Sequence, residues 1–206
     1  MIVPLFPTAV GRNEIGREFT VKELKAINSL ERMNNTGNQM TKNHNVLDIK
    51  ELSSVRKYVN DALNNFFQTV YSPQREVRLD ITQSWINFSK KGDYHHTHTH
   101  QNSFLSGVFY IKADREKDKI YFYKEEYAQL RVYPKEYNEY NSYSWWIDVG
   151  GGDLLLFPSN LTHGVNTVET DERISLSFNT FPVGLLGGHY NSNSLEILKI
   201  GPGNRD

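Results

Sequence analysis

Apolar and polar residues alternate along the chain with two different periods, and the period changes near residue 79. Before that point, apolar residues recur every three or four positions in two stretches, which predicts two helices. The first helix follows a capping box formed by Thr20 and Glu23, and its apolar stripe is Val21, Leu24, Ile27 and Leu30. The second is expected to begin at a cap near Asp48 and Glu51, and its apolar positions are Leu52, Val55, Val59, Leu63, Phe66 and Phe67.

Two further segments precede the change of period. Residues 2–10 are largely apolar and predict a short strand, which Pro4 and Pro7 confine to a sheet edge because proline has no backbone N–H. Residues 34–45, NNTGNQMTKNHN, are polar and predict a loop between the two helices.

From Leu79 onward, apolar and polar residues alternate with period two in short segments separated by Gly, Asp, Asn and Pro, which is typical of β-strands. The segments are ITQSWINF, SFLSGVFYI, KIYFY, SYSWWIDV, DLLLFPS, HGVNTV and RISLSFNTF. Roughly eight strands after two helices predict a mainly β fold, a double-sheet jelly roll with the N-terminal helices packed on one sheet. We expect residues 1–206 to form a single domain. In it, 1–78 supply a strand and helical support and 79–182 form the jelly-roll core.

Composition narrows the classes of function. A formal net charge of −1 over 206 residues gives no basic field for nucleic acid. The chain has no cysteine, so a bound metal must be held by His, Asp or Glu. The start, MIVPLFPTAVGRNEIG, lacks the charged and apolar regions of a signal peptide, and no run approaches the ~20 apolar residues of a membrane span. We therefore expect a cytoplasmic protein without a membrane partner, and a homodimer stays open.

Histidines are concentrated in the stretch GDYHHTHTHQNSF, where four of the seven fall between His95 and His100. His96, His98 and His100 alternate with other residues, so an extended strand would place them on one face. Either this is a solvated polar strand end, or two of the imidazoles bind a metal.

The spacing around these histidines matches jelly rolls of the cupin type. Gly92 is followed after five residues by His98-Thr99-His100, and Gly152 is followed after five residues by Pro158, with His163 five positions further on. Two imidazoles from one strand and a third from a facing strand would leave one side of a metal open. Arg173 follows His163 by ten positions, where an antiparallel return could aim its guanidinium at a carboxylate, and Ser175 shares its face.

Taken in order, LFPT, WINF, GDYHHTHTHQNSFLSGVFYI, GDLLLFPSNLTHGV and RISLSFN resemble the 2-oxoglutarate- and Fe(II)-dependent oxygenases, of the kind found in bacteria and phages. The resemblance runs from residue 5 to about 180 and is densest over 85–179. It implies a dioxygenase that uses Fe(II) and 2-oxoglutarate to hydroxylate a substrate. The implied metal ligands are His98, His100 and His163. The implied cofactor-binding residues are Arg173, Ser175, Tyr110 and Asn87.

One position departs from the family pattern, which has a carboxylate where His100 stands. Three imidazoles would make the site more positive by one charge, and such a site also suits Zn, Ni or Cu. Alternatively, His96 and His98 form the ligand pair. A cupin-like three-histidine protein that does not use 2-oxoglutarate is the second hypothesis, and a non-enzymatic β-sandwich with incidental histidines is the third.

The substrate stays open between a protein side chain, a free amino acid, a nucleobase and a small metabolite. The tyrosine-rich stretch between Tyr121 and Tyr143 is either a lid over the metal or ordinary strand and edge composition.

Overall fold

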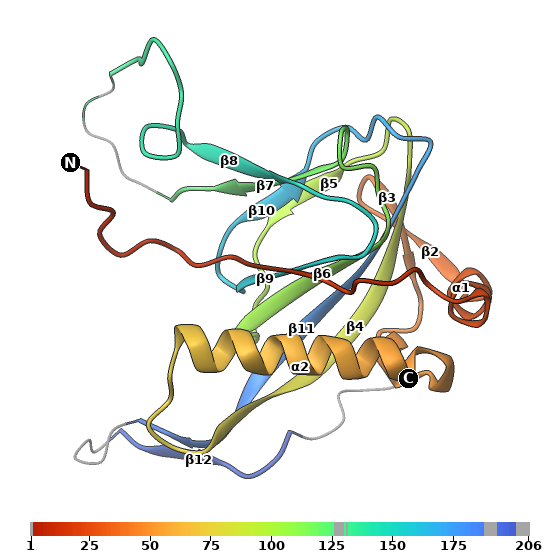
Figure 1. The fold of residues 1–206 in the computed structure, drawn as a ribbon, viewed down its shortest axis with the longest axis horizontal. Helices are drawn as coiled ribbons and strands as arrows, with labels where there is room; N and C mark the ends of the chain where they lie inside the picture. Colours follow the sequence, from red (N-terminus) through yellow and green to blue (C-terminus); the bar gives the residue numbers. More distant parts are fainter. Residues whose placement is uncertain (1, 126–129, 131, 188–192, 201–206) are drawn as a thin grey trace.

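The computed structural model describes residues 2–125, 130, 132–187 and 193–200, and the strands in these residues form two antiparallel sheets (Figure 1). The eight-stranded sheet has the order β1 (Gly11–Glu14), β9 (Asp153–Pro158), β6 (Leu105–Lys112), β11 (Glu172–Leu186), β4 (Val77–Lys90), β3 (Asn38–Thr41) and β2 (Arg32–Asn35), with β12 (Leu195–Ile197) paired to β11. The four-stranded sheet has the order β5 (His95–His98), β10 (His163–Val165), β7 (Lys119–Tyr123) and β8 (Ser144–Asp148). The predicted mainly β, double-sheet architecture is confirmed.

The eight-stranded sheet separates two cores, because successive side chains of a strand point to opposite faces. In β11, Ile174, Leu176 and Phe178 pack into the core on the helical side. The other face points between the two sheets, where the smaller core joins Val108 and Tyr110 of β6 to Ile120 of β7, Val149, and Leu155 and Phe157 of β9. Asn87 of β4 and Arg173, Ser175 and Ser177 of β11 lie on this second face.

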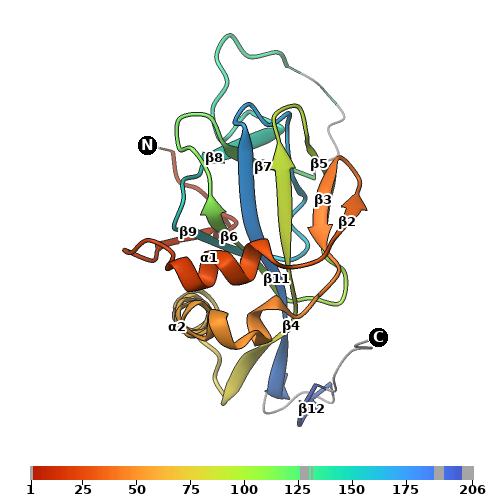
Figure 2. The ribbon, with the colours of Figure 1, turned by 90° about the vertical axis from the view of Figure 1, so that its right-hand side faces the viewer.

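Two α-helices cover the first face: α2 runs across β4 and β11 in Figure 1 and is seen end-on beside the sheet in Figure 2. The helix α1 spans Val21–Asn28 and begins at the predicted capping box, in which the Glu23 amide donates to the Thr20 hydroxyl at 3.2 Å. The predicted apolar stripe is wrong in part, because Val21 is 85% exposed and the charged Glu23 is buried, whereas Ile27 is buried as predicted. Glu23 is buried because Arg17 pairs with it at 2.7 Å.

The second helix, α2, spans Ser53–Val70, and the predicted cap near Asp48 and Glu51 is wrong. Two short 3-10 turns, Val46–Asp48 and Lys50–Leu52, lead into the helix, and no side chain caps it at Leu52. The predicted apolar positions of this helix are buried against the sheet: Leu52, Val55, Val59, Leu63, Phe66 and Phe67.

Two predictions for the N-terminal part are also wrong. Residues 2–10 form no strand, and the edge strand of the sheet is β1, which follows them. Residues 34–45 are not a loop, since they contain most of a β2–β3 hairpin. The hairpin turns at Gly37, whose φ of 85° lies in the region that glycine adopts without strain. Its polar strands have low β-propensity, and pairing of β3 with β4 stabilises them instead.

Candidate metal centre

Three histidines from distant parts of the chain meet at one end of the smaller sheet. His98 on β5 pairs directly with His163 on β10. His100 lies just beyond β5, where its amide donates to the Ser159 carbonyl at 2.9 Å. Ligand nitrogens of His98, His100 and His163 all lie within 4.8 Å of one another, which is close enough for one metal ion.

Gly164 makes the close pairing of β5 and β10 possible. A Cβ on this residue would lie 3.1 Å from the His95 carbonyl oxygen and 3.2 Å from the Thr97 Cα. A larger residue would therefore require β5, which carries His98, to shift by a few tenths of an ångström from β10.

Backbone carbonyls set the tautomers of two of these rings. The Nδ1 of His98 lies 2.7 Å from the His96 carbonyl oxygen, and the Nδ1 of His163 lies 2.9 Å from the Leu161 carbonyl oxygen. Because a carbonyl only accepts, each Nδ1 carries the proton and each Nε2 keeps a free lone pair. The Nε2 atoms of His163 and His100 are 3.2 Å apart. This is the arrangement of metal-binding histidines, whose second nitrogen is held by a carbonyl.

Burial also keeps these imidazoles in the ligating form. Desolvation, with a smaller contribution from neighbouring imidazoles, lowers the pKa of His163 to about 4 and that of His100 to about 3. The pKa of His98 is lowered mainly by burial. Neutral imidazole is the form that binds a metal, so the site does not have to lose protons near neutral pH.

These shifts predict how the stability of the metal-free protein depends on pH. Below about pH 6.5 the unfolded state binds more protons than the folded state. The free energy of unfolding of the metal-free protein should therefore fall as the pH drops from about 6.5 toward 4. Each such histidine contributes at most about 1.4 kcal/mol per pH unit. Urea denaturation of chelator-treated protein at several pH values measures the slope. His163→Gln should have a shallower slope, and a flat wild-type profile would contradict the prediction.

The predicted alternation of His96, His98 and His100 along one strand face is wrong. The strand β5 ends at His98, and His96 is exposed. His95, which the sequence pattern did not single out, lines the pocket together with His98, His100 and His163. A second trio with convergent ligand atoms consists of His95, His96 and His98.

The four predicted cofactor-binding residues lie together beneath the histidines. Tyr110 of β6, Ser175 of β11 and Asn87 of β4 form one row across three paired strands. Arg173 lies two residues along β11 from Ser175 and lines the same pocket. All four side chains are buried, which brings a cation and several hydrogen-bonding groups to one enclosed point.

Three polar atoms in this pocket have no hydrogen-bond partner among the described residues: Asn87 Oδ1, Tyr110 Oη and Arg173 Nε. Unpartnered buried polar atoms are rare and costly, so they indicate that a ligand completes the site. Burial raises the pKa of Tyr110 to about 12, so its phenol remains a donor. A cation and a phenol beside histidine nitrogens fit an organic carboxylate next to a metal.

Asp118 is a site residue that sequence reasoning missed. Its carboxylate lies 3.9 Å from Arg173 Nε, and both side chains are almost fully buried. The Asp114 amide and the Thr170 hydroxyl donate to it at 2.8 and 3.2 Å. Asp118 therefore holds Arg173 and balances its charge. It stands in the charged stretch REKDK, and nothing in that local pattern distinguishes it from a surface carboxylate.

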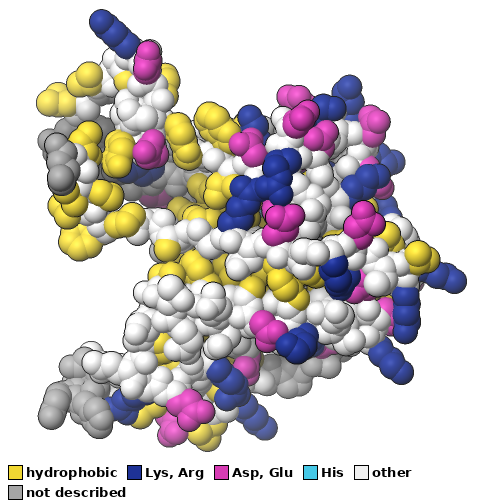
Figure 3. Space-filling view, viewed as in Figure 1, with side chains coloured by type: hydrophobic (Ala, Val, Ile, Leu, Met, Phe, Trp, Pro, Cys, Tyr) yellow, Lys and Arg dark blue, Asp and Glu magenta, His cyan; other side chains and the backbone are white. Residues whose placement is uncertain are grey.

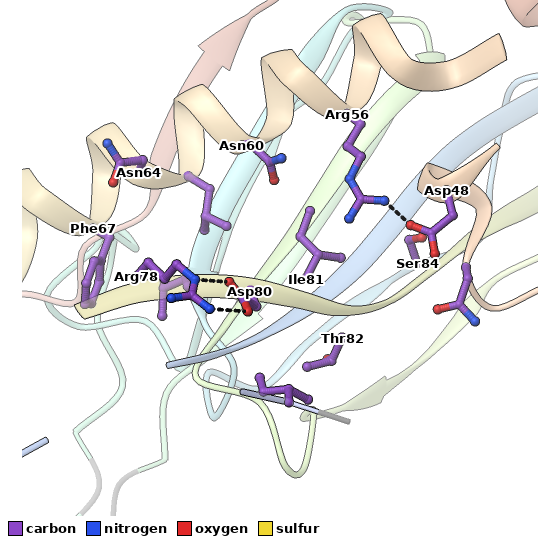
Figure 4. A pocket seen from close by; sticks show the side chains of 14 residues that line it. Asp48, Arg56, Asn60, Asn64, Phe67, Arg78, Asp80, Ile81, Thr82 and Ser84 are labelled. Atoms are coloured by element: carbon purple, nitrogen blue, oxygen red, sulfur yellow. Dashed lines mark hydrogen bonds and ion pairs between the residues drawn. The ribbon is translucent and has the colours of Figure 1, made fainter. Parts of the chain in front are cut away.

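A larger cavity of about 770 Å³ lies between α2 and the first half of β4 (Figure 4). Its two arginines both have carboxylate partners, since Arg56 pairs with Asp48 and Arg78 with Asp80. The histidine pocket is smaller, but its buried cation and unpartnered atoms make it the better candidate for a functional site.

The stretch between β7 and β8 protrudes from the smaller sheet and carries many of the apolar side chains at the upper left of Figure 3. Tyr133, Tyr137 and Tyr140 are exposed, and none of the described tyrosines of this stretch lines the histidine pocket. Tyr127 lies outside the described residues. A lid function stays a prediction.

A histidine cluster beside a buried arginine in a jelly roll is an arrangement that could hold a metal ion next to a carboxylate. Residues 83–179 match the profile of the family described as "Putative 2OG-Fe(II) oxygenase". No curated protein sequence matches the chain. The profile places residues 83–179 among the 2-oxoglutarate- and Fe(II)-dependent oxygenases, which are oxidoreductases.

Solved structures with a similar fold belong to the same class. HygX from Streptomyces hygroscopicus, with nickel, 2-oxoglutarate and hygromycin B bound, is 13% identical with a TM-score of 0.56, over 84% of this chain and 82% of that one. A prolyl hydroxylase from Trichoplax adhaerens, in complex with a hypoxia inducible factor peptide, has the same identity, TM-score and coverage. A Pseudomonas putida prolyl-4-hydroxylase is 10% identical with a TM-score of 0.52, over 84% and 92%. At these identities the likeness concerns the fold. None of the described helices is long and apolar enough to cross a membrane.

Proposed function

We propose that this chain is a 2-oxoglutarate-dependent dioxygenase in which His98, His100 and His163 bind Fe(II) through Nε2. Arg173, with Tyr110, Ser175 and Asn87, binds the carboxylate of 2-oxoglutarate that lies away from the metal. The observation that carries the proposal is the set of buried, unpartnered polar atoms directly beneath the histidine trio.

Fe(II) and 2-oxoglutarate, when bound, supply the oxidation of a substrate C–H bond by dioxygen, with 2-oxoglutarate converted to succinate and CO2. The chain supplies binding, orientation and exclusion of water. Asp118 holds Arg173 in place, and the carbonyls of His96 and Leu161 orient two of the imidazoles. Val108, Ile120 and Trp85 give the pocket apolar walls. The substrate class, a cytoplasmic location and the division at residues 78 and 79 stay predictions.

Turnover of 2-oxoglutarate to succinate tests the proposal before any substrate is known. We expect slow succinate formation by the wild-type protein with Fe(II), and none by His163→Ala or Arg173→Ala. Metal content and 2-oxoglutarate binding are measured on the same samples, because uncoupled turnover is slow in some oxygenases. A wild-type protein that binds neither metal nor 2-oxoglutarate would contradict the proposal.

A further inference from the structure

His95 forms part of the wall of the cofactor pocket. It lines the pocket that contains Arg173, and it also lines an adjoining open cleft of about 720 Å³. Its ring stacks on that of His98, with centroids 4.8 Å apart and an angle of 18° between the planes. His95 therefore lies beside both the histidine trio and the buried cation.

A chain of hydrogen bonds from the β2–β3 hairpin determines which nitrogen of His95 carries the proton. The Thr36 amide donates to Asn35 Oδ1 at 2.8 Å, so Asn35 must present its Nδ2 on the other side, and this atom donates to Asn38 Oδ1 at 3.0 Å. Asn38 in turn presents Nδ2 to Nδ1 of His95 at 3.5 Å. Because a backbone N–H can only donate, the direction of the whole chain is fixed from its first bond.

The hairpin is held beside His95 by the backbone. The Tyr94 amide donates to the Gly37 carbonyl at 3.0 Å, and a Cβ on Gly37 would lie 2.6 Å from the Tyr94 carbonyl oxygen. This contact keeps the asparagines of the hairpin next to the start of β5.

The consequence is that His95 differs from its neighbours. Its Nδ1 accepts from Asn38, so its Nε2 carries the proton, whereas His98 and His163 carry the proton on Nδ1. An imidazole that presents an N–H to a pocket is a donor for an anion and offers no lone pair to a metal there. The trio of His95, His96 and His98 is therefore disfavoured as a metal site in this arrangement.

From this geometry we propose that His95 is a cofactor-contacting residue that donates its Nε2–H to a carboxylate oxygen of 2-oxoglutarate. Asn38 and Asn35 are positioning residues that fix the tautomer of His95. The proposal rests on the proposed function, because Arg173 must attract the same anion into the same pocket.

Calorimetric titration of metal-loaded protein with 2-oxoglutarate, in the absence of oxygen, tests the proposal. His95→Leu should weaken binding by about tenfold or more, since a hydrogen bond to a charged group is lost. His95→Gln keeps an N–H near the position of Nε2 and should bind within about threefold of the wild type. Asn38→Leu, which leaves Nδ1 without its donor, should give an intermediate loss. Thr97→Ala on the same strand is the matched control and should bind as the wild type does.

The outcomes separate this proposal from the one on which it rests. Wild-type protein that does not bind 2-oxoglutarate would overturn the proposed function. A His95→Leu variant that binds as tightly as a binding-competent wild type would overturn only the role of His95. Loss of one equivalent of metal by both His95→Leu and His96→Leu would show a second metal site instead, and would likewise overturn it.

Discussion

Arg173→Leu is expected to abolish measurable 2-oxoglutarate binding while the protein still binds its metal. Arg173 is the only lysine or arginine among the described residues that line the pocket, and its side chain is 3% exposed. Removing one member of a buried charge pair usually costs at least about 3 kcal/mol, so we expect affinity to fall by about a hundredfold or more. Calorimetric titration of the metal-loaded variant measures the loss.

Two control variants separate a binding defect from a folding defect. Arg173→Leu leaves Asp118 buried without its cation, which by itself destabilises the fold. Asp118→Asn added to Arg173→Leu removes that uncompensated charge and should restore thermal stability without restoring 2-oxoglutarate binding. Arg173→Lys keeps the charge but not the planar fork, so it should bind with intermediate affinity. A stable, metal-loaded double variant with wild-type affinity for 2-oxoglutarate would contradict the assignment of Arg173.

His163→Ala is the second variant with a large expected effect, and it should remove the metal. His163 is the one member of the trio that comes from β10. Its ring is fixed by the Leu161 carbonyl and by an edge-to-face contact with the Phe157 ring, whose centroid lies 4.7 Å from that of the imidazole. Losing one of three protein ligands should lower metal affinity by about a hundredfold or more. Metal content after gel filtration, with competition by a chelator of known affinity, measures the change.

His100→Asp is the matched comparison for His163→Ala. It places a carboxylate where the family pattern has one, so the variant should retain the metal, with a site less positive by one charge. His96→Ala should have no effect on metal content, because the His96 side chain is exposed and only its carbonyl contacts His98. If His96→Ala lost the metal while His163→Ala retained it, the trio of His95, His96 and His98 would be the metal site.

The strands were the most predictable part of the fold, because the alternation of apolar and polar residues along a strand indicates directly which of its faces is buried. The segment KIYFY coincides with β7, and DLLLFPS overlaps all of β9. The turn glycines of the motif were also correctly placed, since Gly92 and Gly152 both have φ near 90°. Spacing of this kind is visible in one sequence because it depends on local backbone geometry.

What the sequence could not show depends on contacts between distant segments. The β2–β3 hairpin is stabilised by its partner β4 and not by its own polar residues. Asp118 acquires its role only because β11 brings Arg173 to it. His95 looked equivalent to its neighbours, and only the asparagines of a hairpin more than fifty residues away distinguish it.

The two faces of β11 have different surroundings, and this difference affects how the protein could evolve. Arg173, Ser175 and Ser177 face the pocket, while Ile174, Leu176 and Phe178 face the helical side. Substitutions at odd-numbered positions would alter which molecule is recognised, and those at even-numbered positions would alter how long the protein survives in the cell. Along this segment, ligand specificity and the stability of the fold could therefore evolve through separate substitutions at alternating positions.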